Sequence, residues 1–230
     1  MIKALFGKYF HVPRQQPGWP ILAIAGGLTA IFSALYLPLG LIGLAGFIYL
    51  KIILRMPKRR QPDIKAGQIA APIDGQILMI HHDRENARYL VRVRPDWFNS
   101  HIAYAPIDGL IDQQIWYDGD FIAFGDAEMP GPSCVRQEII FLPSGDASFG
   151  DASFGDASFG DRIAMTHYGE PFVRILQSCL PEGRQVNPSM AVALGVVRPK
   201  IDISFPDSYL VMVVPGKRCL AGETILADKS

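Results

Sequence analysis

Four aspartates recur at a five-residue spacing, three of them in a GDASF segment that is repeated three times in tandem over residues 145–159 and the fourth just after it. Carboxylates held close together are ligands that Ca²⁺ prefers. The spacing of Asp146, Asp151, Asp156 and Asp161 does not match the glycine-rich nonapeptide that stacks into calcium-binding β-rolls. Gly, Asp and Ser instead favour turns. We therefore expect an expanded hairpin loop over 145–161 and no metal site.

The thiols are the next candidates for chemistry. Cys134, Cys179 and Cys219 are too few and too widely spaced for a metal cage or a disulfide framework. We expect them to be buried thiols in a reducing compartment. The chain also has no glycine-rich phosphate loop, no zinc-binding pattern and no basic, aromatic face for nucleic acid.

A pentapeptide that contains an acidic turn residue occurs twice. Ala-Pro-Ile-Asp-Gly stands at 71–75 and again at 105–109, and each copy leads into an apolar run. Asp caps such a turn and Gly supplies a positive φ. The repetition predicts paired half-motifs of a small β-sandwich, which resemble those of lipoyl- and biotinyl-carrier domains. Carrier function does not follow, because the Met-Lys-Met type of attachment site is missing.

Residues 15–50 contain no charged side chain, and most of them are apolar. One helix that crosses a bilayer needs about 20 apolar residues. The run is too long for one such helix and slightly short for two. Pro38 and Gly40 lie near its middle, where proline interrupts helical hydrogen bonding. We expect a transmembrane helical hairpin over 19–54, with helices at about 19–36 and 39–54; one long tilted helix remains the alternative.

The charges around this run are strongly asymmetric. Every charged residue before Asp63 is basic, whereas the whole chain has 22 basic and 22 acidic residues. Basic residues flank both ends of the apolar run, and such residues stay on the cytoplasmic side. An even number of crossings follows, with the soluble domain cytoplasmic and the chain in a bacterial inner membrane. A cleaved signal peptide is not expected, because no small-residue cleavage site follows.

The remainder of the chain is β-rich, and we expect a mainly β sandwich or barrel-like domain (α+β at most). The expected organisation is a basic segment at 1–18, the hairpin at 19–54, a basic linker at 55–66 and the β domain at 67–230. One short helical turn is expected within 94–100. Apolar, β-branched stretches bounded by turn residues predict strands at 76–80, 89–93, 109–116, 138–142, 162–166, 172–178, 191–197, 200–205 and 209–214.

Several motifs together point to one family. They are Arg-Met-Pro at 55–57, the first pentapeptide at 71–75, FNSHIAYAPIDG at 98–109 and VPGKRCLAGETILA at 214–227. This set resembles the short, membrane-anchored branch of the phosphatidylserine decarboxylases. The resemblance covers roughly residues 19–230. Its most specific parts are 101–109 and the closing Ala-Gly-Glu-Thr-x-Leu-Ala.

The resemblance implies a chain that cuts itself at a Gly-Ser bond, so that the serine becomes a pyruvoyl group. That group forms a Schiff base with the amine of phosphatidylserine and accepts electrons as carbon dioxide leaves. The resemblance also implies that Asp74 and His101 supply the base for self-cleavage. Tyr104 stands where related chains have a second histidine or an arginine.

The cleavage site departs from the family pattern. Aligned backward from Asp202, Arg198 and Pro199 occupy the Gly-Ser positions; aligned forward from Leu194, the pair is deleted. Proline has neither a hydroxyl nor a backbone N–H. None of the nearby serines, Ser189, Ser204 and Ser208, follows a glycine. We therefore expect no pyruvoyl cofactor, unless an atypical serine is processed.

Three hypotheses follow. The first is a decarboxylase-like pseudoenzyme of phospholipid metabolism that binds a lipid headgroup, such as phosphatidylserine, or a partner protein. The second is an active enzyme that converts phosphatidylserine to phosphatidylethanolamine and carbon dioxide at an atypical site. The third is a structural or assembly subunit of a membrane complex. A phospholipid membrane is the expected partner in all three, a homodimer or complex partner is possible, and nucleic acid is not expected.

Overall fold

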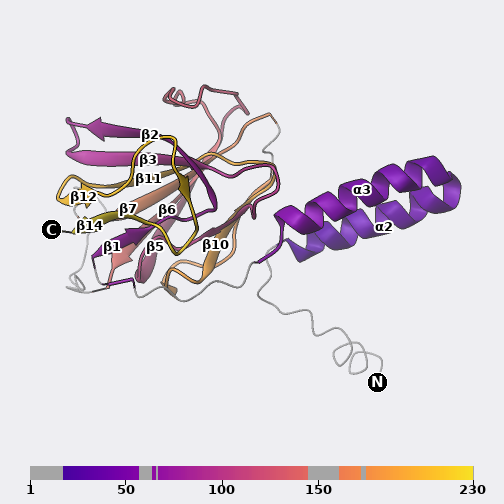
Figure 1. Cartoon of the computed structure of the whole chain (residues 1–230), viewed down its shortest axis with the longest axis horizontal. Helices are drawn as coiled ribbons and strands as arrows, with labels where there is room; N and C mark the ends of the chain where they lie inside the picture. Colours follow the sequence, from indigo (N-terminus) through magenta and orange to yellow (C-terminus); the bar gives the residue numbers. More distant parts are fainter. Residues whose placement is uncertain (1–17, 57–63, 66, 145–160, 172–174, 230) are drawn as a thin grey trace, which may run out of the picture.

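The computed structural model describes residues 18–56, 64–65, 67–144, 161–171 and 175–229. It has a mainly β domain from which two helices project side by side (Figure 1). The predicted loop over 145–161 lies almost wholly outside the described residues, as do the basic residues at 1–17 and 57–63. Three sheets make up the β domain, and all their strand pairs are antiparallel.

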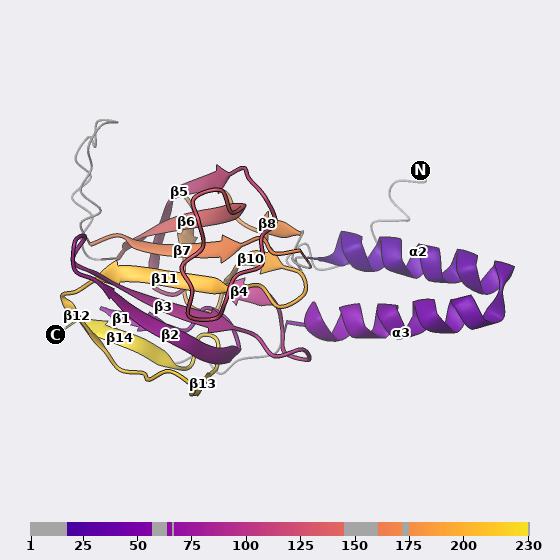
Figure 2. The same cartoon turned by 90° about the horizontal axis from the view of Figure 1, so that it is seen from above.

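The largest sheet has eight strands in the order β13-β2-β3-β11-β7-β6-β5-β9. Its strands curl around the core, as the view in Figure 2 shows. Register shifts in β2 between Ile77 and Met79, and in β5 between Ile111 and Gln113, help the sheet to bend. The strand bounds are β2 Gly75–Asp83, β3 Arg88–Arg94, β5 Gly109–Tyr117, β6 Arg136–Pro143, β7 Ile163–Tyr168, β9 Gln185–Val186, β11 Ile201–Pro206 and β13 Arg218–Cys219.

Two three-stranded sheets complete the domain, in the orders β1-β14-β12 and β4-β10-β8. Apolar side chains from all three sheets, among them Ile69, Val93, Ile139 and Val192, form the main core. The strand bounds are β1 Gln68–Ala70, β4 Ile102–Tyr104, β8 Leu176–Ser178, β10 Ala191–Gly195, β12 Tyr209–Val211 and β14 Ile225–Lys229.

The residue before each pentapeptide donates a backbone hydrogen bond to the proline of the other pentapeptide. Tyr104 N donates to Pro72 O at 2.7 Å, and Ala70 N donates to Pro106 O at 2.7 Å. Their glycines do not have the positive φ that the turn pattern predicted. They are needed for close packing instead, because a Cβ on Gly75 would lie 2.6 Å from the carbonyl carbon of Arg94.

The apolar run forms two helices, α2 Trp19–Leu35 and α3 Leu37–Ile53. Tyr36 between them is extended (φ −159°), and Pro38 lies in the first turn of α3, where proline is tolerated. The single long helix is therefore wrong. The helices pack closely at Gly40, where a Cβ would lie 2.6 Å from Ser33 Cα.

The prediction that this hairpin is transmembrane is also wrong. Each helix has 17 residues, which at 1.5 Å per residue gives a length of about 26 Å. About 20 apolar residues are needed to cross the hydrocarbon core. Among the described residues, no helix has the length and apolarity that a crossing requires.

The base of the hairpin packs onto the β domain. We call the buried residues at this contact the hairpin-root cluster; they are Ile53, Leu54, Ile102, Tyr104, Leu194, Val196 and Ala221. The outer parts of both helices leave large apolar side chains exposed, including Leu28, Leu35, Leu41 and Ile48. The hairpin thus has a buried root and an exposed apolar body.

Candidate functional site

His101 lies directly under the hairpin, at the start of β4. Its side chain is fully buried, and its backbone N–H donates to Ile53 O, near the end of α3, at 2.8 Å. Its carbonyl accepts from Gly195 N, at the end of β10, at 3.4 Å. The helical hairpin and the small β4-β10-β8 sheet therefore fix the position of this histidine together.

The imidazole of His101 lies between two backbone groups. Nε2 faces the carbonyl of Asp96 at 3.3 Å, and Nδ1 accepts the N–H of Arg198 at 3.3 Å. These contacts require the neutral tautomer with the proton on Nε2. Burial lowers the pKa of His101 to about 4, a net value in which the Asp96 contact opposes the burial and the Arg198 charge adds to it. The ring is thus neutral at pH 7 and can accept a proton.

Arg198 and Pro199, the two residues at the expected cleavage position, follow β10 in a constrained loop. Val197 and Arg198 both have positive φ, 66° and 53°, which side chains other than Gly rarely adopt. Pro199 packs closely against Gly195, because a Cβ on Gly195 would lie 2.7 Å from the proline ring. The structure therefore brings His101 and the Arg198 backbone together, as the resemblance implied for a base and a cleavage site.

Asp74 has a different contact. Its Oδ1 accepts the N–H of Ala221 at 2.8 Å. Gly222 N in turn donates to Ala71 O at 2.8 Å, and Ala71 N donates to Thr224 O at 2.8 Å. The first pentapeptide and the closing Ala-Gly-Glu-Thr segment, which lie far apart in the sequence, are thus adjacent.

Tyr104 belongs to the packing of the site. Its residue is 3% exposed, and its ring lies in the hairpin-root cluster. Its backbone connects β4 to Pro72, two residues before Asp74. Tyr104 therefore joins the two parts of the candidate site, and a neutral phenol replaces the basic group implied for this position.

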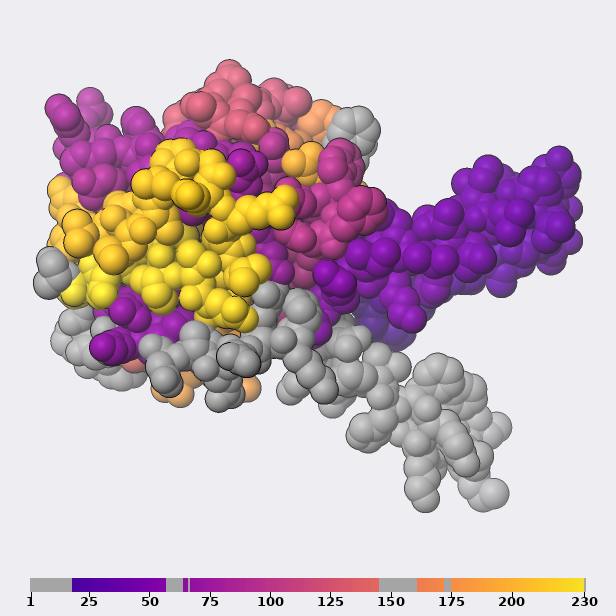
Figure 3. All heavy atoms as spheres, in the orientation of Figure 1, coloured from indigo at the N-terminus to yellow at the C-terminus, as the bar shows by residue number. Residues whose placement is uncertain are grey.

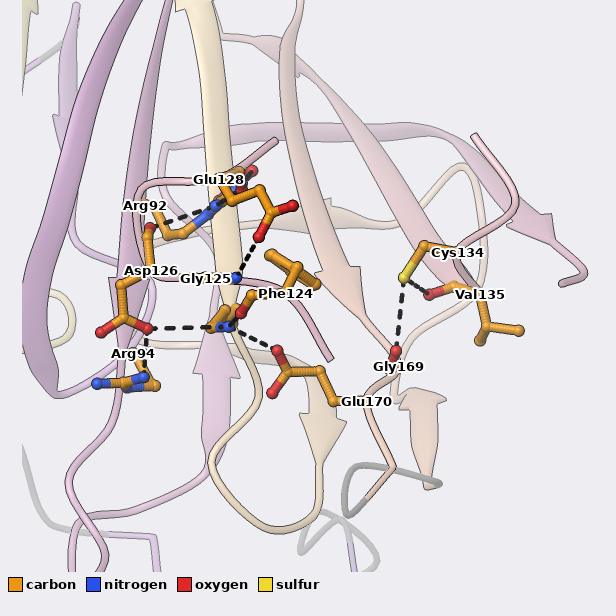
Figure 4. A network of polar contacts seen from close by, with 12 residues as sticks. Arg92, Arg94, Phe124, Gly125, Asp126, Glu128, Cys134, Val135, Gly169 and Glu170 are labelled. Atoms are coloured by element: carbon orange, nitrogen blue, oxygen red, sulfur yellow. Dashed lines mark hydrogen bonds and ion pairs between the residues drawn. The ribbon is translucent and has the colours of Figure 1, made fainter. Parts of the chain in front are cut away.

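A network of charged residues, which sequence reasoning missed, holds residues 124–128 in place (Figure 4). In it Arg94 pairs with Asp126 at 2.5 Å, Lys200 pairs with Glu170 at 2.6 Å, and the Lys200 ammonium also donates to Phe124 O.

Below these pairs, fully buried Arg92 binds Asp202 through two hydrogen bonds of 2.7 Å and donates to the carbonyls of Asp126 and Glu128. The sequence did carry one indication of this network, because charged residues interrupt the apolar strand patterns at 88–94 and 200–205.

The other histidines that the structure describes do not join this site. His167 is buried in β7, and neither ring nitrogen has a hydrogen-bond partner among the described residues. Burial lowers its pKa to about 3. His81 and His82 are exposed on β2. Of the thiols, Cys134 and Cys219 are buried, Cys179 is partly buried, and burial raises the pKa of Cys179 and Cys219 to about 12.

The fold and the site define a mainly β protein in which a buried neutral histidine contacts the loop at the expected cleavage position. The chain is 26% identical to a phosphatidylserine decarboxylase proenzyme of Paramagnetospirillum magneticum, with 96% of this chain and 89% of that protein covered. Proenzymes with the same name from Xanthobacter autotrophicus (24% identity; 95% and 90% covered) and Nitrobacter winogradskyi (25%; 94% and 84%) are also similar.

No family model matches the chain. Similarity to these relatives nevertheless extends over almost its whole length, and it confirms the resemblance to the phosphatidylserine decarboxylases that the motifs predicted. The relatives do not distinguish an active enzyme from a pseudoenzyme.

Proposed function

We propose that this chain is a phosphatidylserine decarboxylase-like protein of phospholipid metabolism that does not form its own pyruvoyl group. One observation carries the proposal: the peptide N–H on the imidazole of His101 belongs to Arg198, and Pro199 follows it. A pyruvoyl group needs the hydroxyl of a serine, which proline lacks. The residues at this position therefore do not fit the cofactor.

The nearest serines in the sequence have other contacts. Ser204 lies in the middle of β11, between β3 and β7, and its Oγ accepts from Arg88 Nε at 2.9 Å. The Ser189 Oγ donates to Asn187 Oδ1. A nucleophilic hydroxyl needs a base beside it, and the hydrogen bonds of these two serines to described residues involve no histidine.

Without the cofactor, the proposed role is the binding of a phospholipid headgroup at a membrane surface on the cytoplasmic side of the inner membrane. The exposed apolar side chains of the helices and the basic residues at 3–14 and 51–60 support this proposal. Each basic residue near anionic headgroups contributes on the order of 1 kcal/mol.

The second candidate is an active decarboxylase that uses an atypical serine, and the names of the relatives are equally consistent with it. The intact mass of the purified natural protein separates the two candidates. We expect a single uncut chain of 25.4 kDa that does not react with borohydride or hydrazine. Two fragments, one with a pyruvoyl-blocked N-terminus, would overturn the proposal.

A further inference from the structure

Arg198 differs from its cationic neighbours in one respect. Each neighbour has a carboxylate within 4.0 Å, whereas Arg198 has none among the described residues. Its positive charge is therefore not neutralised by a direct ion pair. The neighbouring pairs are Arg92–Asp202, Arg94–Asp126, Lys200–Glu170 and Arg218–Asp96.

The guanidinium of Arg198 is nevertheless held in place. Its Nε donates to Pro95 O at 3.1 Å, and its central carbon lies 4.7 Å from the ring centroid of Trp97. The backbone of Arg198 is also constrained, because its φ is positive. A guanidinium has five N–H donors, and the two terminal nitrogens of this one make no hydrogen bond to the residues that the structure describes. A fixed cation with donors to spare can bind an anion.

Exposed apolar side chains lie near Arg198, in addition to the charged groups of Arg94, Asp96 and Asp126. Trp97 is 54% exposed and Phe98 is 66% exposed. The Phe98 ring meets Tyr49 of α3 edge-on at 6.2 Å, and exposed Ile48 precedes Tyr49. Exposed aromatic and aliphatic side chains beside a cation fit a ligand with an anionic headgroup and an apolar tail.

Tyr49 adds a second polar group. Its hydroxyl is buried and has no hydrogen-bond partner among the described residues. Burial raises the pKa of Tyr49, although the charge of nearby Arg198 opposes this, so the hydroxyl remains a donor. An unsatisfied buried donor costs free energy, and a ligand oxygen at Arg198 would give it an acceptor.

We propose that Arg198 binds the phosphate of an anionic phospholipid headgroup, while Trp97, Phe98 and α3 contact the apolar part of the same lipid. This inference rests on the proposed function. The resemblance implies an amine-reactive group at this position in related chains, whereas a guanidinium repels an ammonium ion and attracts a phosphate. The preferred ligand is thus defined by its phosphate and net negative charge, not by an amine.

The test compares binding of the full chain to vesicles of phosphatidylcholine alone and of phosphatidylcholine mixed with phosphatidylglycerol or phosphatidylserine. We expect phosphatidylglycerol to bind at least as tightly as phosphatidylserine. Arg198→Gly removes the charge and relieves the positive φ, so it should fold; it should weaken binding to the anionic vesicles roughly fivefold. Arg198→Lys should retain most of the binding.

Two control variants separate the effect of the Arg198 charge from the effects of a relaxed loop and of a lower net charge. Val197→Gly relieves the same loop without a charge change, and Arg84→Gly removes one charge from the β2–β3 turn, which lies at the end of the domain opposite the helices (Figure 1). Both should bind like the wild type. Equal losses in Arg198→Gly and Arg84→Gly, or binding of phosphatidylserine only, would overturn the inference.

A soluble ligand gives the last comparison. Glycerol phosphate should not displace the protein from vesicles at concentrations equal to that of the anionic lipid; full displacement would assign Arg198 to a free phosphate and overturn the lipid assignment. The wild-type chain is weighed intact first. An uncut chain without an Arg198-dependent preference contradicts this inference alone, whereas a cut chain contradicts the proposed function.

Discussion

At the scale of single residues, the hydrogen bond from Arg198 N to His101 Nδ1 is the contact with the clearest chemical consequence. The double variant Arg198→Gly, Pro199→Ser places a glycine at the positive φ and a hydroxyl on the following residue. Because the neutral imidazole of His101 lies 3.3 Å from the backbone nitrogen of residue 198, we expect this variant to cut itself before residue 199. Intact mass measured over time should show two fragments.

The control for this experiment is the same double variant with His101→Ala, which should remain uncut. A second control is the single variant Arg198→Gly, which has no hydroxyl and should also remain whole. If the double variant stayed uncut while its thermal unfolding matched that of the wild type, the rest of the fold would not support self-cleavage.

His167 provides a test of pH dependence. Its pKa is about 3 in the folded protein and about 6.5 in an unfolded chain. The unfolded state therefore binds more protons below pH 6.5, and the contribution of this neutral histidine to stability is lost as pH falls from about 6.5 toward 3. Between pH 7 and pH 5 the loss should be roughly 2 kcal/mol.

Replacement of His167 by leucine removes this titration. In urea unfolding, His167→Leu should therefore lose about 2 kcal/mol less than the wild type between pH 7 and pH 5. His101, with a pKa of about 4, should leave part of the pH dependence in the variant. Identical pH slopes for the two proteins would contradict the burial of a neutral His167.

Sequence motifs located Asp74, His101 and Arg198 because each lies in or beside a short local pattern. The pairing of Arg92 with Asp202 was not accessible in the same way, because the two residues are 110 positions apart. Only the register of β3 against β11 places them opposite each other. Local patterns predict local geometry, whereas cross-strand partners depend on the whole fold.

At the scale of elements, loss of one partner of the buried pair between β3 and β11 should strongly destabilise the large sheet. Asp202→Asn leaves the Arg92 guanidinium buried without its counter-charge, because both side chains are almost fully buried. The free energy of unfolding should fall by about 3–5 kcal/mol. Chemical denaturation measures this directly.

The matched comparison is Asp161→Asn, which breaks the exposed 3.0 Å pair with Lys229. That variant should lose less than about 1 kcal/mol. A loss of similar size in the two variants would mean that the Arg92 site is hydrated and not buried.

The packing of α2 against α3 should depend on Gly40, the small residue at their closest approach. Gly40→Leu cannot be accommodated against the Ser33 backbone, so the helices should separate near the turn. Spin labels at exposed Leu28 and Leu44 should report a longer and broader distance distribution. Gly46→Ala, where an added Cβ meets nothing within 4 Å, should leave the distribution unchanged.

Element prediction succeeded for most of the long patterned segments and failed for most of the short ones. The strands predicted at 76–80 and 89–93 correspond to β2 and β3, because their apolar runs are bounded by turn residues. β1, β4, β9, β13 and β14 were missed. The first four have only two or three residues, which carry no periodicity, and the five-residue β14 ends in the charged residues Asp228 and Lys229. The predicted helical turn within 94–100 is a hydrogen-bonded turn at Asp96–Asn99.

At the scale of the whole molecule, the hairpin and the candidate site form one packed unit. The surface in Figure 3 shows the helices as an extension from one end of the β domain. Fully buried Ile53 lies at that junction, and its carbonyl holds the N–H of His101. A force on the apolar helices therefore acts directly on the backbone that positions the imidazole.

Ile53→Ala tests this coupling. The cavity at the hairpin-root cluster should cost about 2–5 kcal/mol, and it should loosen the loops on both sides of His101. Hydrogen exchange followed by mass spectrometry should show faster exchange in peptides 95–104 and 190–200. Leu28→Ala, on the exposed body of α2, should leave exchange in those peptides unchanged. Because the root joins the helices to only one end of the β domain, peptides from β6 and β7 should keep their wild-type protection in both variants, and a uniform increase across all peptides would indicate global destabilisation without specific coupling.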